Sequence, residues 1–317
     1  KGVNFPNTII DIEVITKKDE ADIAWGVKNR VDYFAISFVQ NAKDMRRARE
    51  LLGDYKGKLI AKIEKFDAVS NIDEIIETSD GIMVARGDLG IEVPYYDVPT
   101  IQKMLIKKSN AKGIPVITAT QMLLSMTQNE RATRAEISDV ANAVLDGTDI
   151  VMLSEESAVG ENPVNVVETM HNIIKQTEKI FDHEKRYKFT YLDEFDVIQA
   201  TVTKLADDLS ADGILSLTSS GNSARKMSRY RPITPLYTFA HDKETLTGLT
   251  ALWGVEPITT VKEAQASKMI QRMLRSLEKR EILNKKGLYI CTVGYPVGIP
   301  GSTNTIKILT PSEIEFY

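Results

Sequence analysis

The sequence of 317 residues contains one cysteine, Cys291, and three histidines. A single cysteine excludes an intrachain disulfide framework and a cysteine-based zinc cluster, and it favours a reducing compartment. No run of about 18 apolar residues is present, so a transmembrane helix is not expected. Neither sign of charge dominates, because 40 Lys and Arg stand against 44 Asp and Glu. This balance gives no electrostatic reason to expect nucleic acid or an anionic membrane as a partner.

Several catalytic patterns are also missing. Neither G-x-G-x-x-G nor G-x-x-x-x-G-K-[ST] occurs, which removes the usual arguments for a dinucleotide-binding fold and for a P-loop. His171, His183 and His241 fall in helical or linker segments, so a Ser-His-Asp triad is poorly supported and a surface or capping role is favoured. Cys291 lies within an apolar run, which indicates a buried core position rather than a nucleophile.

The first half of the chain alternates short apolar runs with segments of helical spacing. The runs rich in Val, Ile and Leu are 33–38, 58–63, 81–85, 115–119 and 149–153. Helical spacing is found between them, for example in 42–52, 98–112 and 136–145, and again in 163–181. Such alternation predicts parallel βα units, and largely apolar runs are typical of strands covered on both faces.

Polar residues stand at the end of each run. They are Ser37, then Lys62 with Glu64, then Arg86, Gly87 and Asp88, then Thr118, Thr120 and Gln121, and finally Ser154 with Glu155. In a parallel barrel the carboxyl ends of the strands converge on one rim, where catalytic groups gather. The sequence therefore predicts an α/β protein containing a partial (β/α)8 TIM barrel, about its last five βα units, with the missing strands expected before Lys1.

A second α/β unit is expected after a charged, aromatic segment. We assign 1–181 to the C-terminal portion of the barrel, 182–195 to a linker and 196–317 to a three-layer α/β domain. The expected strands of this domain are 213–217, 235–239, 256–260, 288–293 and 305–309, and its expected helices are 223–230, 243–252 and 264–280. Only a short loop joins the last two strands, so that pair should be antiparallel.

Lys62, Glu64 and Asp88 form the first chemical constellation. Lys62 and Glu64 share one face of a strand, because side chains alternate, and Asp88 follows the next strand between two glycines. Magnesium prefers one or two protein carboxylates together with water and phosphate oxygens. A nearby lysine can stabilise a phosphoryl group during its transfer. The three residues suit Mg²⁺-assisted phosphoryl transfer, although an exposed salt bridge and a βα loop with a capping aspartate remain alternatives.

Two more segments can bind an anion or move a proton. Gly87 can expose backbone N–H groups to an anion. Thr120 offers a hydroxyl that could bind or relay a proton, or could simply cap a following helix.

The second domain carries a hydroxyl-rich turn, Thr218-Ser219-Ser220-Gly221-Asn222-Ser223, between a strand and a helix with Arg225 and Lys226. Hydroxyls at a helix start favour an anion site, and a plain N-cap is the alternative. The loop 294–304, rich in glycine and proline, could lie over the same site.

Taken together, these motifs resemble the pyruvate kinase family. The matching stretches are A-K-I-E at 61–64, S-D-G-I-M-V-A-R-G-D-L-G at 79–90, A-T-Q-M-L at 119–123, T-R-A-E at 133–136 and S-D-V-A-N-A-V at 138–144. The likeness runs in order over essentially the whole chain, including the Thr-Ser-Ser-Gly segment and the Gly-x-Pro-x-Gly-x-Pro-Gly loop. It implies a (β/α)8 barrel, a lid domain inserted after the third strand, and a C-terminal α/β domain that binds regulatory phosphosugars in many members.

The resemblance also implies an activity and a set of site residues. The family carries out a glycolytic step, the transfer of phosphate from phosphoenolpyruvate to ADP to give pyruvate and ATP, with Mg²⁺ and usually K⁺, and a cytoplasmic homotetramer is expected. By motif match Lys62 and Thr120 are catalytic, and Glu64 and Asp88 bind the metal. The residues that would bind phosphoenolpyruvate are Lys62, Gly87, Asp88 and Thr120. Two further residues at the rim are Ser37 and Ser154. The residues that would bind the effector phosphate are Thr218, Ser219, Ser220, Asn222 and Ser223.

Some positions depart from the family pattern. Glu155 replaces a glycine near the nucleotide side, Gln40 stands where arginine is common, and Ala132 stands where proline is common. The stretch 1–4 resembles the exit from the lid, so the first barrel strands, the lid and the K⁺ ligands are expected to be absent and the chain alone to be inactive. Two other classes stay open: a non-catalytic regulatory or structural fragment, and another Mg²⁺ barrel enzyme of enolpyruvate chemistry.

Overall fold

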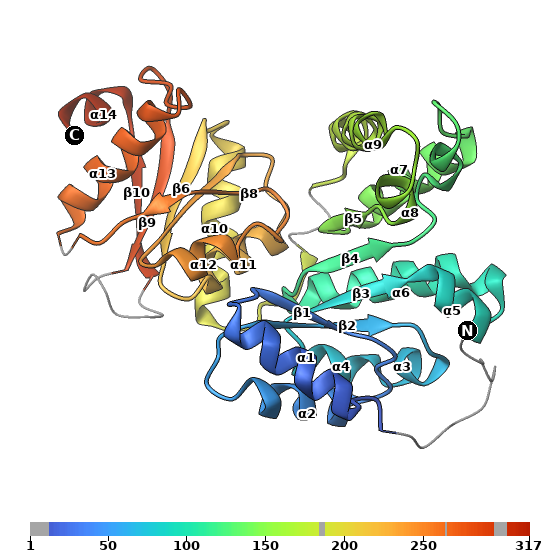
Figure 1. Ribbon diagram of the computed structural model, residues 1–317. Helices are drawn as coiled ribbons and strands as arrows, with labels where there is room; N and C mark the ends of the chain where they lie inside the picture. Colours follow the sequence, from blue (N-terminus) through green and yellow to red (C-terminus); the bar gives the residue numbers. More distant parts are fainter. Residues whose placement is uncertain (1–12, 184–187, 264, 295–302) are drawn as a thin grey trace. The chain divides into compact units, whose positions relative to one another are not determined.

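The computed structural model describes residues 13–183, 188–263, 265–294 and 303–317 and divides the chain into two compact units, Lys1–Phe181 and Asp182–Tyr317 (Figure 1). Most of the loop 294–304 and the stretch 1–4 lie outside the described residues, so the expectations placed on them are not tested. Across the described ranges, no helix is long and apolar enough to cross a membrane.

The first unit is built on a parallel sheet of five consecutive strands. Its order is β1 (Tyr33–Ile36), β2 (Lys58–Ile63), β3 (Gly81–Ala85), β4 (Val116–Ala119) and β5 (Ile150–Met152), and all four neighbouring pairs are parallel. Within the part of the chain that the structure describes, this sheet stays open, with β1 and β5 at its edges. Together with the second α/β unit, this arrangement confirms the fold class expected from the sequence.

Helices connect and flank these strands. They are α1 (Lys17–Lys28), α2 (Ala42–Leu52), α3 (Phe66–Ser70), α4 (Ile72–Thr78), α5 (Arg86–Glu92), α6 (Val98–Lys112), α7 (Arg134–Asp146), α8 (Glu155–Ala158) and α9 (Pro163–Thr177). Side-chain capping boxes start three of them, at Thr16, Asn41 and Thr133. A capping box satisfies two backbone N–H groups that a helix start would otherwise leave unpaired, so the local sequence fixes where these helices begin.

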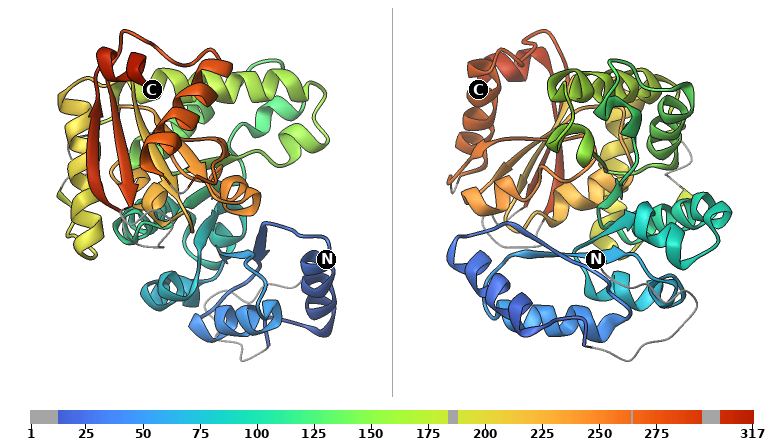
Figure 2. Two further views of the ribbon diagram at one scale, coloured as in Figure 1. Left: turned by 90° about the vertical axis from the view of Figure 1, so that its left-hand side faces the viewer. Right: turned by 45° about the vertical axis from the view of Figure 1, so that its right-hand side comes forward.

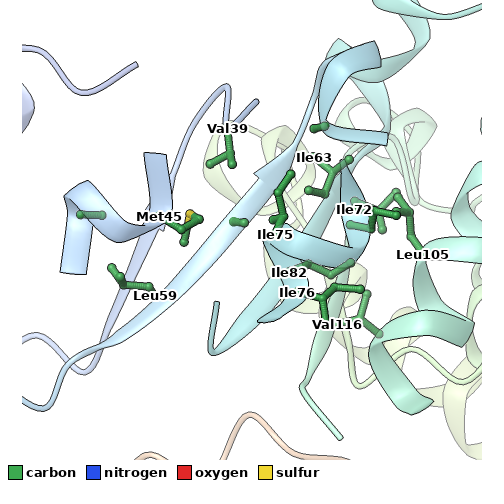
Figure 3. Packing of buried hydrophobic residues seen from close by; sticks show 14 of the residues in the cluster. Val39, Met45, Leu59, Ile63, Ile72, Ile75, Ile76, Ile82, Leu105 and Val116 are labelled. Atoms are coloured by element: carbon green, nitrogen blue, oxygen red, sulfur yellow. The ribbon is translucent and has the colours of Figure 1, made fainter. Parts of the chain in front are cut away.

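The two faces of the first sheet are covered differently. Leu59, Ala61 and Ile63 of β2 pack against α2, α4 and α6 in one buried cluster, part of which Figure 3 shows with Val39, Met45, Leu59, Ile63, Ile72, Ile75, Ile76, Ile82, Leu105 and Val116 labelled. The opposite face carries a smaller cluster of strand residues, namely Tyr33, Ile60, Met83, Ile117, Ala119 and Met152. Lys62 alternates in step with Ile60 and therefore lies on this second face, the interior face of the expected barrel.

The second unit has a mixed five-stranded sheet. Its order is β10 (Thr303–Leu309), β9 (Tyr289–Gly294), β6 (Gly213–Thr218), β7 (Leu236–Ala240) and β8 (Val255–Thr260). β10 pairs antiparallel with β9, as expected, and the other pairs are parallel. Figure 2 shows α10 (Glu194–Asp208) and α13 (Ala266–Lys279) on opposite faces of this sheet, which makes the unit three-layered.

The remaining helices of this unit are α11 (Asn222–Arg229), α12 (Lys243–Thr247) and α14 (Pro311–Phe316). The expectation of a helix over 243–252 was wrong in length, because α12 ends at Thr247. Gly248 follows directly, and glycine and threonine are poor helix formers. The hydroxyl of Thr250 donates to the carbonyl of Thr247, which supports a turn in place of further helix.

Cys291 and the histidines occupy the kinds of position that the sequence indicated. Cys291 is fully buried in β9, and burial raises the pKa of its thiol to about 12. His171 is exposed on α9. The Nδ1 atoms of His183 and His241 hydrogen-bond with the carbonyl oxygens of Arg231 and Val261. None of these four side chains offers a nucleophile or a triad.

Candidate active site

Lys62 and Glu64 meet at the carboxyl end of β2. Lys62 Nζ lies 2.7 Å from Glu64 Oε1 and donates to Ser37 Oγ at 3.0 Å. Glu64 is only 1% exposed, and its Oε2 accepts from the backbone N–H of Phe38 at 2.7 Å. The carboxylate is therefore buried and bonded on both oxygens, so the alternative of an exposed salt bridge was wrong. Ser37 reaches the pair from the end of β1, which brings two of the five strand ends together.

Asp88 lies just beyond the end of the neighbouring strand. Ile63 of β2 pairs with Val84 of β3, so Glu64 stands level with Ala85. Helix α5 starts at Arg86, immediately after β3, and Asp88 falls in its first turn, partly buried. The sequence did not predict this helix and suggested a tight glycine turn instead.

Gly87 lies in the first turn of α5, close to Thr120. Its backbone is helical rather than left-handed, so conformational freedom is not the reason for a glycine here. A Cβ at Gly87 would lie 3.4 Å from Thr120 Oγ1. This is the short end of ordinary van der Waals contact, so packing against Thr120 alone does not require a glycine here.

Thr120 presents its hydroxyl between β3 and β4. Its Oγ1 accepts from the Gly87 N–H at 2.8 Å and donates to the Ala119 carbonyl at 2.6 Å. Its φ of 71° places the backbone in the left-handed region, and Gln121 follows with φ of 54°. No helix begins here to be capped, so the alternative of a capping threonine was wrong.

Arg86 is a site residue to which the sequence assigned no role. Its Nη2 donates to the Thr120 carbonyl at 2.7 Å, and its Nη1 lies 2.6 Å from Asp139 Oδ2. The side chain of Arg86 is 9% exposed. The one available signal was an arginine directly after a fully buried strand, since such a charge must find partners.

Ser154 is held at the end of β5 by Glu156. The fully buried Glu156 accepts from the Ser154 N–H at 2.7 Å and from the Leu123 N–H at 3.2 Å. It thereby ties the segment after β4 to the segment after β5. The sequence drew attention to Glu155, which is exposed on α8, and missed Glu156.

The carboxylates at this edge suit a magnesium ion. Glu64 and Asp88 stand at the ends of adjacent strands, and the described ranges hold no group of three or more His, Cys, Asp or Glu side chains arranged for a metal. Magnesium takes few protein ligands and keeps positions for water and phosphate oxygens, whereas a structural zinc site needs four protein ligands. The residues present therefore fit Mg²⁺ better than zinc.

The hydroxyl-rich turn of the second unit begins α11. Thr218 is 4% exposed, and its Oγ1 accepts from the N–H of Gly221, whose φ of 82° makes the turn possible. Ser220 and Asn222 are exposed. The Lys226 side chain is buried and pairs with Asp193, so it is not available to an anion at this turn.

Ser219 and Ser223 are intermediate in burial between the buried Thr218 and the exposed Ser220. Both are partly buried, and Ser223 Oγ lies 3.2 Å from Thr303 Oγ1 at the start of β10. The Ser219 carbonyl accepts from the Thr245 hydroxyl at 3.5 Å. Arg225 is partly exposed on the first turns of α11 and is the cation left for an anion there.

Two family models and several curated relatives match the chain. Residues 1–167 match the model described as pyruvate kinase, barrel domain, and residues 196–309 match pyruvate kinase, alpha/beta domain. A pyruvate kinase of Geobacillus stearothermophilus is 42% identical over 321 residues, covering 99% of this chain and 55% of the relative. One of Lactobacillus delbrueckii subsp. bulgaricus is 42% identical over 97% of this chain and 54% of the relative.

A pyruvate kinase of Clostridium acetobutylicum is 41% identical over 97% of this chain and 67% of the relative. The chain thus spans about half the length of the first two relatives. Alignments over nearly the whole chain lend no support to the expectation that it is an inactive fragment. On the evidence of its barrel and α/β matches, the chain belongs to the pyruvate kinase family.

Proposed function

We propose that the protein is a phosphotransferase that transfers the phosphoryl group of phosphoenolpyruvate to ADP, giving pyruvate and ATP. The observation that carries the proposal is the pairing of Lys62 with the buried Glu64 at the carboxyl end of β2, with Asp88 just beyond the end of the adjacent parallel strand. In the reaction the P–O bond of phosphoenolpyruvate breaks, a P–O bond to the terminal phosphate of ADP forms, and the enolate takes a proton on carbon.

Lys62 supplies the positive charge for this step. Its Nζ is held by Glu64 and Ser37, yet its side chain is 25% exposed, so it can face a bound phosphate. A fixed ammonium group stabilises negative charge that develops on the phosphoryl oxygens, and it needs no reorganisation during the reaction. Near the start of α5, the Gly87 and Asp88 backbone and the Thr120 hydroxyl would orient the carboxylate of phosphoenolpyruvate.

Glu64 and Asp88 would hold Mg²⁺. When bound, this ion supplies neutralisation of the phosphate charge, which is the usual role of Mg²⁺ in phosphoryl transfer. Family membership also implies K⁺. A homotetramer and the cytoplasm as its compartment are proposed on the same family grounds.

The test replaces Lys62 by Met and measures pyruvate formation from phosphoenolpyruvate and ADP. Loss of a preorganised charge should lower kcat by about 100-fold to 1000-fold. Lys58→Met is the matched control, because Lys58 lies on the same strand, 3.5 Å from the carboxylate of Asp80, but at the amino end. Near-normal kcat in Lys62→Met would refute the role of the lysine, and turnover that needs no nucleotide would favour a lyase or aldolase instead.

We also propose that the turn formed by Ser219, Ser220, Asn222 and Ser223 binds the phosphate of a sugar effector. The exposed hydroxyls at the start of α11 and the nearby Arg225 support this, since the amino end of a helix favours anions. Thr218 shapes the turn from inside and would not contact the ligand directly.

The effector site is tested with a Ser220→Ala, Ser223→Ala double variant. Turnover is measured with and without glucose 6-phosphate and fructose 1,6-bisphosphate as probes. Activation seen in the unaltered protein should be lost in the double variant and kept in Ser276→Ala, a serine of α13. Unaltered activation of the double variant would place the effector elsewhere.

A further inference from the structure

The turn after β4 adopts a backbone conformation that its residues do not prefer. Thr120 and Gln121 both have positive φ, at 71° and 54°. For a β-branched residue such as threonine this region is strongly disfavoured, because its side chain crowds the backbone. A strained conformation persists only where surrounding contacts hold it, and such strain is concentrated at functional sites.

Arg86 makes the contacts that hold this turn. Its Nε and Nη2 donate to the Thr120 carbonyl at 3.3 and 2.7 Å, and its Nη2 lies 2.9 Å from the sulfur of the fully buried Met122. Its Nη1 donates to both carboxylate oxygens of Asp139 on α7, at 2.7 and 2.6 Å. The guanidinium therefore anchors the turn to α7, and a planar, multiply donating group suits that task in a way that lysine does not.

The hydroxyl of Thr120 is held by Gly87, the residue that follows Arg86 in the chain. While the Arg86 side chain fixes the carbonyl of Thr120, the Gly87 N–H donates to its hydroxyl. Arg86 and Gly87, consecutive residues at the start of α5, thus bind two different groups of Thr120, its carbonyl and its hydroxyl. These hydrogen bonds determine where the hydroxyl of Thr120 lies relative to Asp88, in the first turn of α5.

We propose that Arg86 is a positioning residue, which acts through Thr120 and is itself held in place by Asp139. This inference rests on the proposed function, in which the Thr120 hydroxyl contacts the substrate. Without the guanidinium, the turn relaxes toward an ordinary backbone conformation and the hydroxyl leaves its place. Since a displacement of about 1 Å can cost about 100-fold in rate, the effect appears in kcat rather than in folding.

The experiment compares Arg86→Lys with Arg49→Lys. Arg49 is a matched control, because it also donates to a backbone carbonyl, that of Gly57 at 3.1 Å, and to a carboxylate, that of Asp80. It does so at the amino end of the strands, away from Lys62. We expect Arg86→Lys to lower kcat by about 100-fold, and Arg49→Lys to leave kcat within about twofold.

A double-mutant cycle separates positioning from general loss of structure. If Arg86 acts through Thr120, the Arg86→Lys, Thr120→Ala double variant is no slower than Thr120→Ala alone, because coupled residues are not additive. Full additivity of the two losses, or normal kcat in Arg86→Lys, would overturn the proposal.

A second measurement does not depend on turnover. Hydrogen exchange at the Gly87 amide should quicken in Arg86→Lys and stay unchanged in Arg49→Lys, because that amide donates to the hydroxyl that Arg86 keeps in place. If the unaltered protein forms no pyruvate, the proposed function fails, yet this exchange still decides whether Arg86 holds Thr120. Unchanged hydrogen exchange of the Gly87 amide in Arg86→Lys would contradict the claim that Arg86 holds Thr120 in place.

Discussion

Asp80 lies at the edge of the first sheet where the strands begin, and we expect loss of its carboxylate to destabilise the first unit. It precedes β3, is 18% exposed, and accepts from Arg49 and from the Leu59 N–H at 2.9 Å, while Lys58 Nζ lies 3.5 Å away. Asp80→Asn removes the charge and keeps the size. Hydrogen bonds to a charged group contribute about 1.5–3 kcal/mol each, and Arg49 is 41% exposed, so we expect a loss of about 2–3 kcal/mol.

Asp73→Asn is the control. Asp73 accepts from Lys108 with both oxygens at 2.7 Å, but its side chain is 75% exposed. Exposed ion pairs contribute about 0–1 kcal/mol. We therefore expect Asp73→Asn to lower the free energy of unfolding less than Asp80→Asn does. Urea unfolding is measured for each variant, with hydrogen exchange over 58–63 as the local probe, because the two units can unfold separately.

The pH dependence of Asp80→Asn gives a further check. Burial raises the pKa of Asp80, but the bonds from Arg49 and Leu59 and the charge of Lys58 outweigh burial, so its pKa in the folded protein is lowered. A carboxyl whose pKa is lowered on folding stabilises the protein above its unfolded pKa, about 3.9, and loses that contribution as the pH falls. The deficit of Asp80→Asn should therefore shrink on acidification below about pH 4. Equal losses in Asp80→Asn and Asp73→Asn, or a deficit that grows in acid, would refute the reasoning.

Two other predictions concern the second unit. Asp196→Ala should destabilise it by about 3–5 kcal/mol in urea unfolding, because it leaves the guanidinium of Arg229, 1% exposed, without its carboxylate; a loss below about 1 kcal/mol would contradict the importance of this pair. Cys291 should resist thiol reagents at pH 8 until urea unfolds the unit, because burial raises its pKa to about 12, and rapid labelling of the folded protein would disprove this.

Much of the fold was predictable because its signals are local. The strands 58–63 and 81–85 and the helices 42–52 and 98–112 agree with the structure in their bounds. Each depends on a spacing of apolar residues that one stretch of chain carries by itself. The same locality placed Lys62 and Glu64 on one strand face.

Contacts between distant segments were not predictable. Arg86 meets Thr120 across 34 positions and Asp139 across 53, and no local pattern specifies either pairing. Lys226 pairs with Asp193, the residue that caps the start of α10, and no local pattern indicated this pairing. Glu156 passed unnoticed beside Glu155 because only the path of the chain decides which of two adjacent glutamates is buried.

The amino-acid sequence by itself determined the order of the strands, the apolar faces, and the residue types that end each strand, because side-chain periodicity is a property of short segments. Only the tertiary structure decided that Ser37, Lys62 and Glu64 meet, and that Thr120 takes a left-handed backbone beside Gly87. Those outcomes depend on strand register and on packing between helices, and both are set when separate segments come together.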